Sequence, residues 1–229
     1  AVERSKLSRK ITTVGFVEYD ESKMAHIHLR TQGWIEQLQM RSEGERVKRG
    51  DFLFSLYSPE LVNAQEELLN ALRLGNNSLI KASQDRLIAL GVPDSDIKKL
   101  TQTRELLQKI SYFAPQDGVV ADLMVREGMF VKPENQIATL ADLSSIWVLA
   151  EVFESESAWV EIGSAAEVEF GYLPGEKFIG VVEYIYPNLD PITRALTVRL
   201  KFKNADELLK PNMFGNVSIH VMEKSNIII

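Results

Sequence analysis

The chain has 229 residues, 45% of them hydrophobic and 25% charged, which is typical of folded protein and allows two or three small domains. Its net charge is −6 and it has no block of basic residues, which argues against nucleic acid as a partner. The absence of cysteine excludes disulfides, thiolate zinc sites and cysteine nucleophiles, and it fits an oxidising compartment.

After a predicted strand at residues 11–19, the chain carries an alternating group of potential metal ligands. Met24, His26 and His28 follow i, i+2, i+4 spacing, so on a strand all three side chains share one face. A thioether with two imidazoles suits a soft ion such as Cu(I) or Ag(I). The alternative is that these are surface or half-buried strand residues, since same-face neighbours on a flat strand stand about 7 Å apart. Both interpretations stay open, and these three residues are the candidate metal ligands.

An internal repeat is the most informative feature of the sequence. The segment that begins at Gly33 reads GWIEQLQMRSEGERVKRGDFLFSL, and the segment that begins at Gly118 reads GVVADLMVREGMFVKPENQIATL. Each copy has a glycine turn, a strand, a Glu-Gly turn, a Val-Lys pair, a polar turn and a second strand. We expect the glycines to adopt the positive φ that tight reversals need. Neither copy is long enough to close a core, so the two copies are predicted to face each other as one β-sandwich.

The residues between the two copies have helical periodicity. Ser58 and Pro59 are typical of a helix N-cap and first turn, and an apolar face then recurs as far as the next glycine. This first helix would be roughly 24 Å long at 1.5 Å per residue. Gly75 ends it, Ser78 is predicted to cap a second helix, and a third short helix follows. The insert is therefore predicted to be a compact helical hairpin.

The C-terminal part of the sequence is a series of short strands separated by the turn-forming clusters GYLPGE, PNLDP and KPN. Apolar and polar residues alternate in residues 196–202, which predicts a strand with one buried and one solvent-exposed face. Together with residues 11–19, the series predicts a small antiparallel barrel with a helical turn near residues 154–160 at one end. Three isoleucines at residues 227–229 predict the start of a further strand. The predicted strands are residues 147–153, 166–170, 177–185, 195–202 and 214–221.

Several of these motifs resemble a known family. The doubled Glu-Gly-x-x-Val-Lys pattern resembles biotinyl and lipoyl domains. The helical insert between the copies, followed by the barrel, resembles the periplasmic adaptor (membrane fusion) proteins of resistance-nodulation-division heavy-metal efflux systems, and within them the copper/silver branch. The resemblance covers about residues 14–221. It depends on SPELVNAQEELL at 58–69, GVPDSDIKKL at 91–100, APQDGVV at 114–120 and LDPITRALTVRLKFKNADELLKPNM at 189–213.

The resemblance implies a non-enzymatic protein of the periplasm, associated with the inner membrane. Its partners would be an inner-membrane resistance-nodulation-division pump and an outer-membrane channel, and copies would self-associate into a ring in the assembly. The tip of the hairpin would contact the channel. No cofactor is implied, and Cu(I), Ag(I) or another metal cation would be transient cargo. The tip residues are Gly75, Asn76, Asn77 and Ser78.

A metal-binding chaperone, a carrier subunit of an enzyme and a hydrolase are the alternatives to an adaptor. A stand-alone periplasmic metal-binding chaperone would hold metal without a stable partner. A carrier subunit of an enzyme would need an exposed lysine on the hairpin between the halves, but the next lysine after Lys48 is Lys81, in the second predicted helix. The sequence also has no Gly-x-Ser-x-Gly elbow, and no serine or carboxylate pattern accompanies its three histidines. Hydrolytic catalysis is therefore not predicted.

The predicted fold is mostly β with a helical insert, in an elongated multidomain chain. A split biotinyl/lipoyl-like β-sandwich occupies residues 25–57 and 111–142. A short α-helical hairpin at residues 58–110 separates its halves. Residues 1–24 and 143–229 are predicted to form a small antiparallel β-barrel domain with remnants of a membrane-proximal domain.

Overall fold

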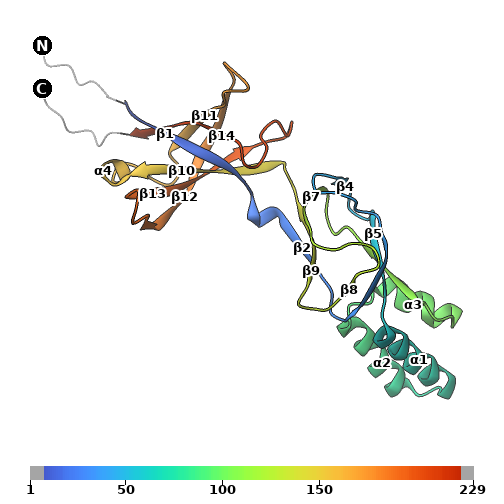
Figure 1. Cartoon of the computed structure of the whole chain (residues 1–229). Helices are drawn as coiled ribbons and strands as arrows, with labels where there is room; N and C mark the ends of the chain where they lie inside the picture. The colour runs from blue at the N-terminus through green and yellow to red at the C-terminus, as the bar shows by residue number, and fades with distance from the viewer. Residues whose placement is uncertain (1–7, 223–229) are drawn as a thin grey trace, which may run out of the picture. The chain divides into compact units, whose positions relative to one another are not determined.

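A computed structural model describes residues 8–222 (Figure 1). The chain forms two compact units, Ala1–Lys23 with Leu143–Ile229, and Met24–Asp142. The strand predicted at residues 227–229 lies outside the described residues. Within the described range, no helix is both long enough and apolar enough to cross a bilayer.

The first unit is a closed antiparallel β-barrel, as the alternating strands predict. The order around the barrel is β1 (Ser8–Tyr19), β10 (Ser145–Phe153), β13 (Ala195–Lys203), β12 (Lys177–Leu189), β11 (Ala165–Glu169) and β14 (Phe214–Met222). Every neighbouring pair is antiparallel. In β10, Ile146, Val148, Ala150 and Val152 alternate into the core and are completely buried. The two-residue period of a strand therefore places the apolar residues on the inside.

Two details of the barrel extend the prediction. The helical turn expected near residues 154–160 is α4 (Glu154–Ser157), and Val160 after it is buried in the barrel core. β12 continues to Leu189, farther than predicted, and has two register shifts against β13. Such irregularities bend a strand and increase its twist, which lets one long strand follow a curved barrel wall.

The second unit contains two four-stranded sheets around a common core. One sheet has the order β2 (Met24–His28), β9 (Gln136–Ala141), β7 (Gly118–Leu123) and β4 (Arg46–Val47). The other has the order β6 (Lys109–Phe113), β5 (Phe52–Tyr57), β3 (Gly33–Leu38) and β8 (Phe130–Val131). The two copies of the repeat thus come together in space as one sandwich, as the sequence predicts.

The two copies exchange strands, so neither sheet belongs to one copy. β2 and β4 form the edges around β9 and β7, while β6 and β8 form the edges around β5 and β3. The hydrogen bonds repeat accordingly: the Gly44 N–H donates to the Val120 carbonyl at 2.8 Å, and the Gly128 N–H donates to the Ile35 carbonyl at 2.7 Å. β2 and β6 occupy equivalent edges, so the repeat is one strand longer than the sequence comparison indicates.

The glycines that begin the equivalent strands β3 and β7 allow a close approach between strands. A Cβ at Gly33 would overlap the carbonyl oxygen of Tyr57, and a Cβ at Gly118 would overlap the carbonyl oxygen of Ala141. The prediction of positive φ is therefore wrong for Gly33, where the constraint is steric. It is confirmed for Gly118, with φ of 158°, and for the two Glu-Gly turns, whose glycines have φ of 81° and 83°.

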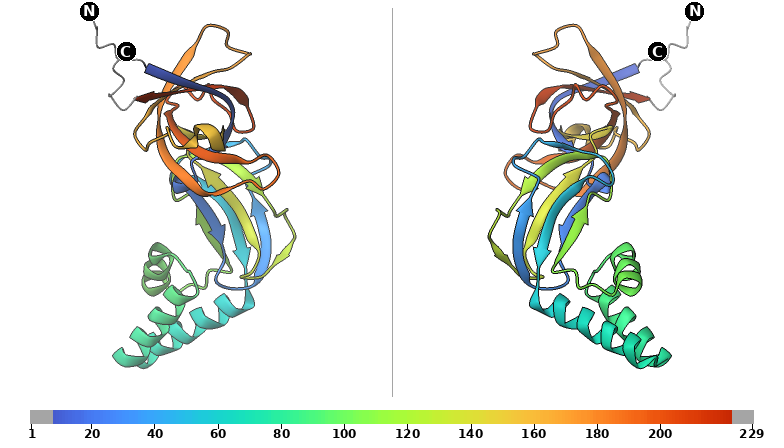
Figure 2. Two further views of the ribbon diagram at one scale, coloured as in Figure 1. Left: turned by 90° about the vertical axis from the view of Figure 1, so that its left-hand side faces the viewer. Right: turned by 90° about the vertical axis from the view of Figure 1, so that its right-hand side faces the viewer.

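The helical insert lies between β5 and β6 and contains α1 (Pro59–Leu74), α2 (Asn77–Ala89) and α3 (Asp94–Thr103) (Figure 2). Ser58 caps α1 by accepting a backbone N–H of the first turn, and Gly75 ends it with φ of 67°. The predicted second cap is wrong. Asn76 Oδ1 accepts from the N–H groups of Ser78 and Leu79 at 3.1 and 3.3 Å, so Asn76 is the N-cap. An asparagine side chain placed directly before the helix satisfies these free donors first.

Candidate functional site

The helical hairpin leaves and rejoins the sandwich at one place. β5 and β6 are paired neighbours, and Tyr57 lies opposite Lys109 at the end of the pair. The loop between β2 and β3 also holds the base of the hairpin. The Thr31 hydroxyl donates to Glu60 Oε2 at 2.7 Å, and Arg30 donates to the Ile88 carbonyl at 3.4 Å. The hairpin is therefore attached through both of its ends and through this loop.

The far end of the hairpin is the turn between α1 and α2. The structure brings the four predicted tip residues, Gly75, Asn76, Asn77 and Ser78, into this turn, and all four are exposed. Leu74 on one side of the turn is 74% exposed, and Leu79 on the other side is 47% exposed. No signal in the sequence marks these two leucines as exposed, because they belong to otherwise amphipathic helices. Exposed apolar side chains around a polar turn are typical of a contact surface.

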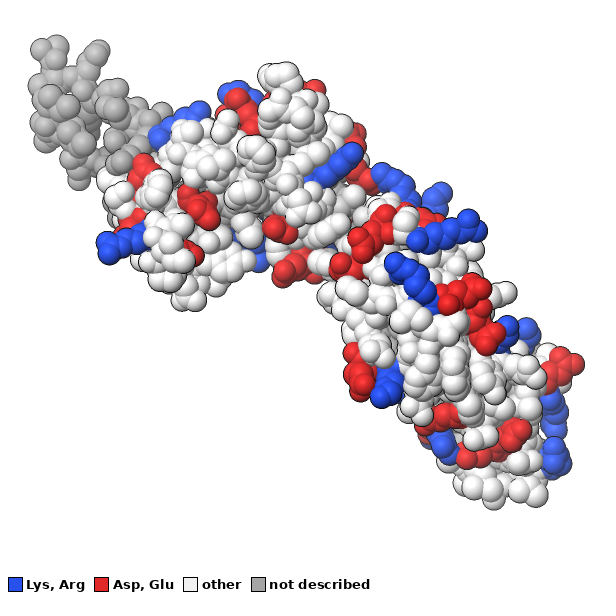
Figure 3. All heavy atoms as spheres, in the orientation of Figure 1, with Lys and Arg blue, Asp and Glu red and all other residues white. Residues whose placement is uncertain are grey.

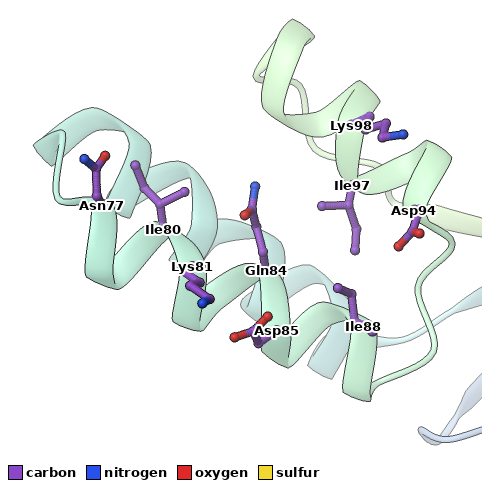
Figure 4. A pocket seen from close by; sticks show the side chains of 9 residues that line it. All are labelled: Asn77, Ile80, Lys81, Gln84, Asp85, Ile88, Asp94, Ile97 and Lys98. Carbon is purple, nitrogen blue, oxygen red and sulfur yellow. The ribbon is translucent and has the colours of Figure 1, made fainter.

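A groove of about 500 Å³ lies between α2 and α3 (Figure 4). Ile80 and Ile88 on α2 face Ile97 on α3 and form its apolar part. The groove depends on how α3 folds back beside α2, so no sequence motif could reveal it. Its polar lining consists of Asn77, Lys81, Gln84, Asp85, Asp94 and Lys98.

The candidate metal ligands Met24, His26 and His28 lie together on edge strand β2. Both histidines are exposed, and His26 Nδ1 lies 3.3 Å from Thr139 Oγ1. A register shift against β9 falls between Ile27 and His28. Across residues 8–222, no three histidine, aspartate or glutamate side chains gather as metal ligands. The predicted set includes a methionine thioether, so the metal site stays a prediction.

A charge network links the end of β1 to three other strands of the barrel unit. The Asp20 carboxylate accepts from Ser145 Oγ at 2.6 Å and lies 3.4 Å from Lys201 Nζ, which lies 3.0 Å from Glu183 Oε1. Burial alone would raise the pKa of the Asp20 carboxyl, but hydrogen bonds from Ser145 and Ser22 and the Lys201 ammonium lower it overall. The hydrogen bond to Glu183 is the main cause that raises the pKa of Lys201. The Asp20 carboxylate and the Lys201 ammonium are therefore both charged at neutral pH, and their contacts hold these strands together.

Charged side chains of both signs are interspersed over the face of the molecule shown in Figure 3, between wide uncharged areas. A nucleic-acid site would instead show lysine and arginine gathered along one stripe. The distribution on this face agrees with the absence of a basic block in the sequence. A partner that binds this face would therefore contact uncharged surface and small local groups of charge.

Two domain models of one family match the chain in order. The model described as "CusB, barrel-sandwich hybrid domain" matches residues 24–141, which is more than half of the chain. The model described as "CusB-like, beta-barrel domain" matches residues 145–223. These spans correspond to the strand-exchanged sandwich with its helical insert and to the barrel.

Curated relatives agree with the domain models. The chain is 30% identical over 229 residues to the "Putative membrane fusion protein SilB" of Salmonella typhimurium, covering 100% of this chain and 53% of that protein. It is 31% identical over 199 residues to the "Cation efflux system protein CusB" of Escherichia coli (strain K12), covering 86% of this chain and 49% of that protein. The chain thus spans about half the length of these relatives.

Solved structures show the same fold. ZneB from Cupriavidus metallidurans matches with a TM-score of 0.64 and 22% identity, over 94% of this chain and 100% of that chain. MacA from Actinobacillus actinomycetemcomitans matches with a TM-score of 0.62 and 18% identity, over 96% of this chain and 81% of that chain. At these identities the likeness establishes the fold. With both domain models matched in order on that fold, the chain belongs to the CusB-like family of membrane fusion proteins.

Proposed function

We propose that this chain acts in a periplasmic adaptor, associated with the inner membrane, that links a heavy-metal pump of the resistance-nodulation-division class to an outer-membrane channel. One observation carries the proposal: a helical hairpin projects from a split sandwich in a chain that matches both CusB domains in order. The exported ion in this proposal is Cu(I), Ag(I) or another metal cation, in line with the relative named a cation efflux system protein.

The geometry of the insert supports an assembly role over a carrier role. A biotinyl or lipoyl carrier needs a lysine on the tight hairpin between its halves, and here α1, α2 and α3 occupy that place. The first lysine after β5 is Lys81, within α2. What the insert offers instead is an exposed turn flanked by Leu74 and Leu79. Apolar side chains at the far end of a hairpin suit contact with another protein better than attachment of a prosthetic group.

The remaining parts of the proposal concern metal and self-association. Met24, His26 and His28 would hold Cu(I) or Ag(I) transiently, and no resident cofactor is proposed. Copies of the adaptor would self-associate into a ring in the assembly. A stand-alone metal-binding chaperone is the less favoured alternative, because both domain models and the relatives named here are those of membrane fusion and efflux proteins. The two functions differ in that only the adaptor needs the hairpin tip.

The test uses the full-length protein in a cell that lacks its own copper and silver efflux adaptor. Leu74→Asp combined with Leu79→Asp should abolish silver resistance while the protein accumulates normally. The matched control is Asn63→Asp, on the exposed face of α1 and far from the turn along the helix. Full resistance in the tip variant would contradict tip docking. Resistance that persists in the tip variant but is lost with Met24, His26 and His28 changed to alanine would favour the chaperone.

A further inference from the structure

One row of side chains crosses all four strands of the sheet with the order β6, β5, β3 and β8. Phe130 on β8 pairs with Trp34 on β3, and Trp34 pairs with Tyr57 on β5. Tyr57 in turn pairs with Lys109 on β6, where the helical insert leaves and rejoins the sheet. Neighbouring strands lie about 4.8 Å apart, so the row is about 14 Å long. We call Phe130, Trp34 and Tyr57 the aromatic row.

The aromatic row faces away from the core of the sandwich. The neighbouring residues Ile35 on β3 and Leu56 on β5 pair with each other, are completely buried and belong to that core. Because successive side chains on a strand point to opposite faces, Trp34 and Tyr57 lie on the outer face of the sheet. Trp34 is 40% exposed and Phe130 is 43% exposed. The core is complete without these rings, so their exposure indicates a contact surface.

The rings of the aromatic row contact one another and form a continuous surface. The ring centroids of Trp34 and Phe130 lie 4.8 Å apart, with the planes tilted by 57°. The ring centroids of Trp34 and Tyr57 lie 6.1 Å apart, with the planes tilted by 34°. The indole is thus held between two other rings. A ligand that stacks on the row finds these side chains already in place and loses little conformational entropy in ordering them.

The polar groups beside the aromatic row carry no net charge. Lys109 Nζ lies 2.8 Å from Glu36 Oε2, so a carboxylate of the same sheet neutralises the ammonium group at the end of the row. Ser111, two residues after Lys109 on β6, lies on the same face and adds a hydroxyl group. A surface without net charge offers little attraction to an anionic lipid surface or to nucleic acid. It complements an uncharged ligand that has both apolar faces and polar edges.

A glycan chain of pyranose rings has this chemistry. One face of such a ring presents C–H groups that stack on aromatic rings, and its edges carry hydroxyl or acetamido groups that hydrogen-bond to charged and hydroxyl side chains. In a β-1,4-linked glycan the sugars follow one another at an interval close to the about 4.8 Å between neighbouring strands. A polyproline II peptide also stacks on aromatic side chains, but it repeats only about every 9 Å, and its prolines have no N–H to donate.

We propose that the aromatic row is a binding site for β-1,4-linked N-acetylated glycan strands, with Trp34 as the central stacking residue. Phe130 and Tyr57 extend the stacking surface to the sugars on either side, and the pair of Lys109 and Glu36 hydrogen-bonds their polar edges. The source of the glycan rests on the proposed function, which places the chain in the periplasm, the compartment that holds the peptidoglycan. The contact would hold the sandwich beside the cell wall and does not use the hairpin tip.

The test measures co-sedimentation of the full-length protein with purified peptidoglycan sacculi. Trp34→Ala should weaken binding about tenfold, as expected for an aromatic anchor. Phe130→Ala, which removes a second ring independently, should also weaken binding, whereas Trp34→Tyr should retain most of it because tyrosine still supplies a stacking face. The control is Phe214→Ala, which removes a 67% exposed ring from β14 in the barrel unit and should leave binding unchanged. Tetra-N-acetylchitotetraose should compete with the sacculi, and high ionic strength should leave the complex intact.

The outcomes separate this proposal from the alternatives. Wild-type protein that does not sediment with sacculi, or binding that is unchanged by both Trp34→Ala and Phe130→Ala, would overturn the glycan site. Loss of binding at high ionic strength would overturn it too, because the contact would then be ionic. Competition by decaproline but not by the chitotetraose would identify a polyproline ligand instead. A dimer in analytical ultracentrifugation that Trp34→Ala abolishes, with unchanged binding to sacculi, would identify a second copy of the chain as the occupant.

The glycan site and the adaptor function fail in different experiments. Each result against the glycan site leaves the adaptor function standing, because silver resistance of the hairpin-tip variant tests that function separately. Full resistance in the tip variant would contradict tip docking, and the sacculi would still measure whether the aromatic row binds glycan.

Discussion

Gln65 of α1 and Leu107, two residues before β6, are joined by a pair of hydrogen bonds. Gln65 Nε2 donates to the Leu107 carbonyl at 2.9 Å, and the Leu107 N–H donates to Gln65 Oε1 at 2.9 Å. Gln65 Nε2 also donates to the Leu61 carbonyl at 3.1 Å, and the residue is 1% exposed. The buried side-chain amide of Gln65 thus pairs with the Leu107 backbone in place of another backbone group. This pairing fixes α1 to the segment that leads back to β6.

Replacing this amide should loosen the base of the hairpin. Gln65→Ala leaves the partly buried Leu107 N–H and carbonyl without these partners, so the free energy of unfolding should fall by about 1–3 kcal/mol. Urea denaturation followed by circular dichroism measures the loss, and hydrogen exchange should show faster exchange at Leu107. Gln102→Ala, on the exposed face of α3, is the control. Equal stability of the two variants would contradict the role given to Gln65.

The two classes of repeat glycine should respond differently to alanine. At Gly33 the new Cβ meets the Tyr57 carbonyl oxygen of a paired strand, so Gly33→Ala should cost about 3 kcal/mol through forced separation of β3 and β5. At Gly128 the Cβ meets no atom within 4 Å. Only the left-handed backbone conformation therefore destabilises Gly128→Ala, and it should lower the free energy of unfolding by about 1 kcal/mol. Thermal and urea unfolding of both variants measure which substitution causes the larger loss of stability. The reverse order would show that backbone conformation outweighs the close approach.

Leu200 tests the barrel core. The side chain is completely buried on β13, so Leu200→Ala should lower the free energy of unfolding by about 2–5 kcal/mol. Tryptophan fluorescence reports on the barrel through Trp147 and Trp159 once Trp34 in the sandwich is replaced by phenylalanine. Lys203→Ala, exposed on the same strand, should change little. A loss well below about 1 kcal/mol for Leu200→Ala would contradict the burial of this face.

Asp20 should make the barrel sensitive to acid. Its pKa is lower in the folded protein than the value of about 3.9 for an unfolded chain, so its contribution to stability is present above about pH 4 and is lost as the pH falls below that. Asp20→Asn should reduce stability at pH 7, and its difference from the wild type should shrink below pH 4. Unfolding free energies measured from neutral to acid pH check this. The exposed control Asp206→Asn should keep the wild-type profile, and a constant difference for Asp20→Asn would be the contrary result.

The sequence predicts elements that have strong local signals. Ser58, Pro59 and Gly75 mark the ends of α1, because capping and left-handed termination depend on the chain beside them. The six long barrel strands follow from their alternation or their β-branched content. The repeat predicts that two copies share one core, because conserved spacing of turns places the same strands in each copy.

Features that depend on distant pairing could not be predicted in this way. β4 and β8 are two residues long, too short to show any period, and only the fold reveals that the copies exchange them. The second cap was misplaced because Asn76 and Ser78 are both good N-caps and local chemistry alone does not choose between them. The exposed leucines of the tip and the α2–α3 groove arise only when separate segments meet. The metal set Met24, His26 and His28 stays a prediction.

The pairing of Tyr57 with Lys109 has a consequence for how proteins of this design could vary. Because Tyr57 and Lys109 lie directly opposite each other on paired strands, the insert between them begins and ends at the same place. Whole helical turns can be added to or removed from the insert without changing the pairing of β5 with β6. The fold of the sandwich then stays the same while the length of the helical hairpin changes, one helical turn at a time, to suit the distance that the hairpin has to span.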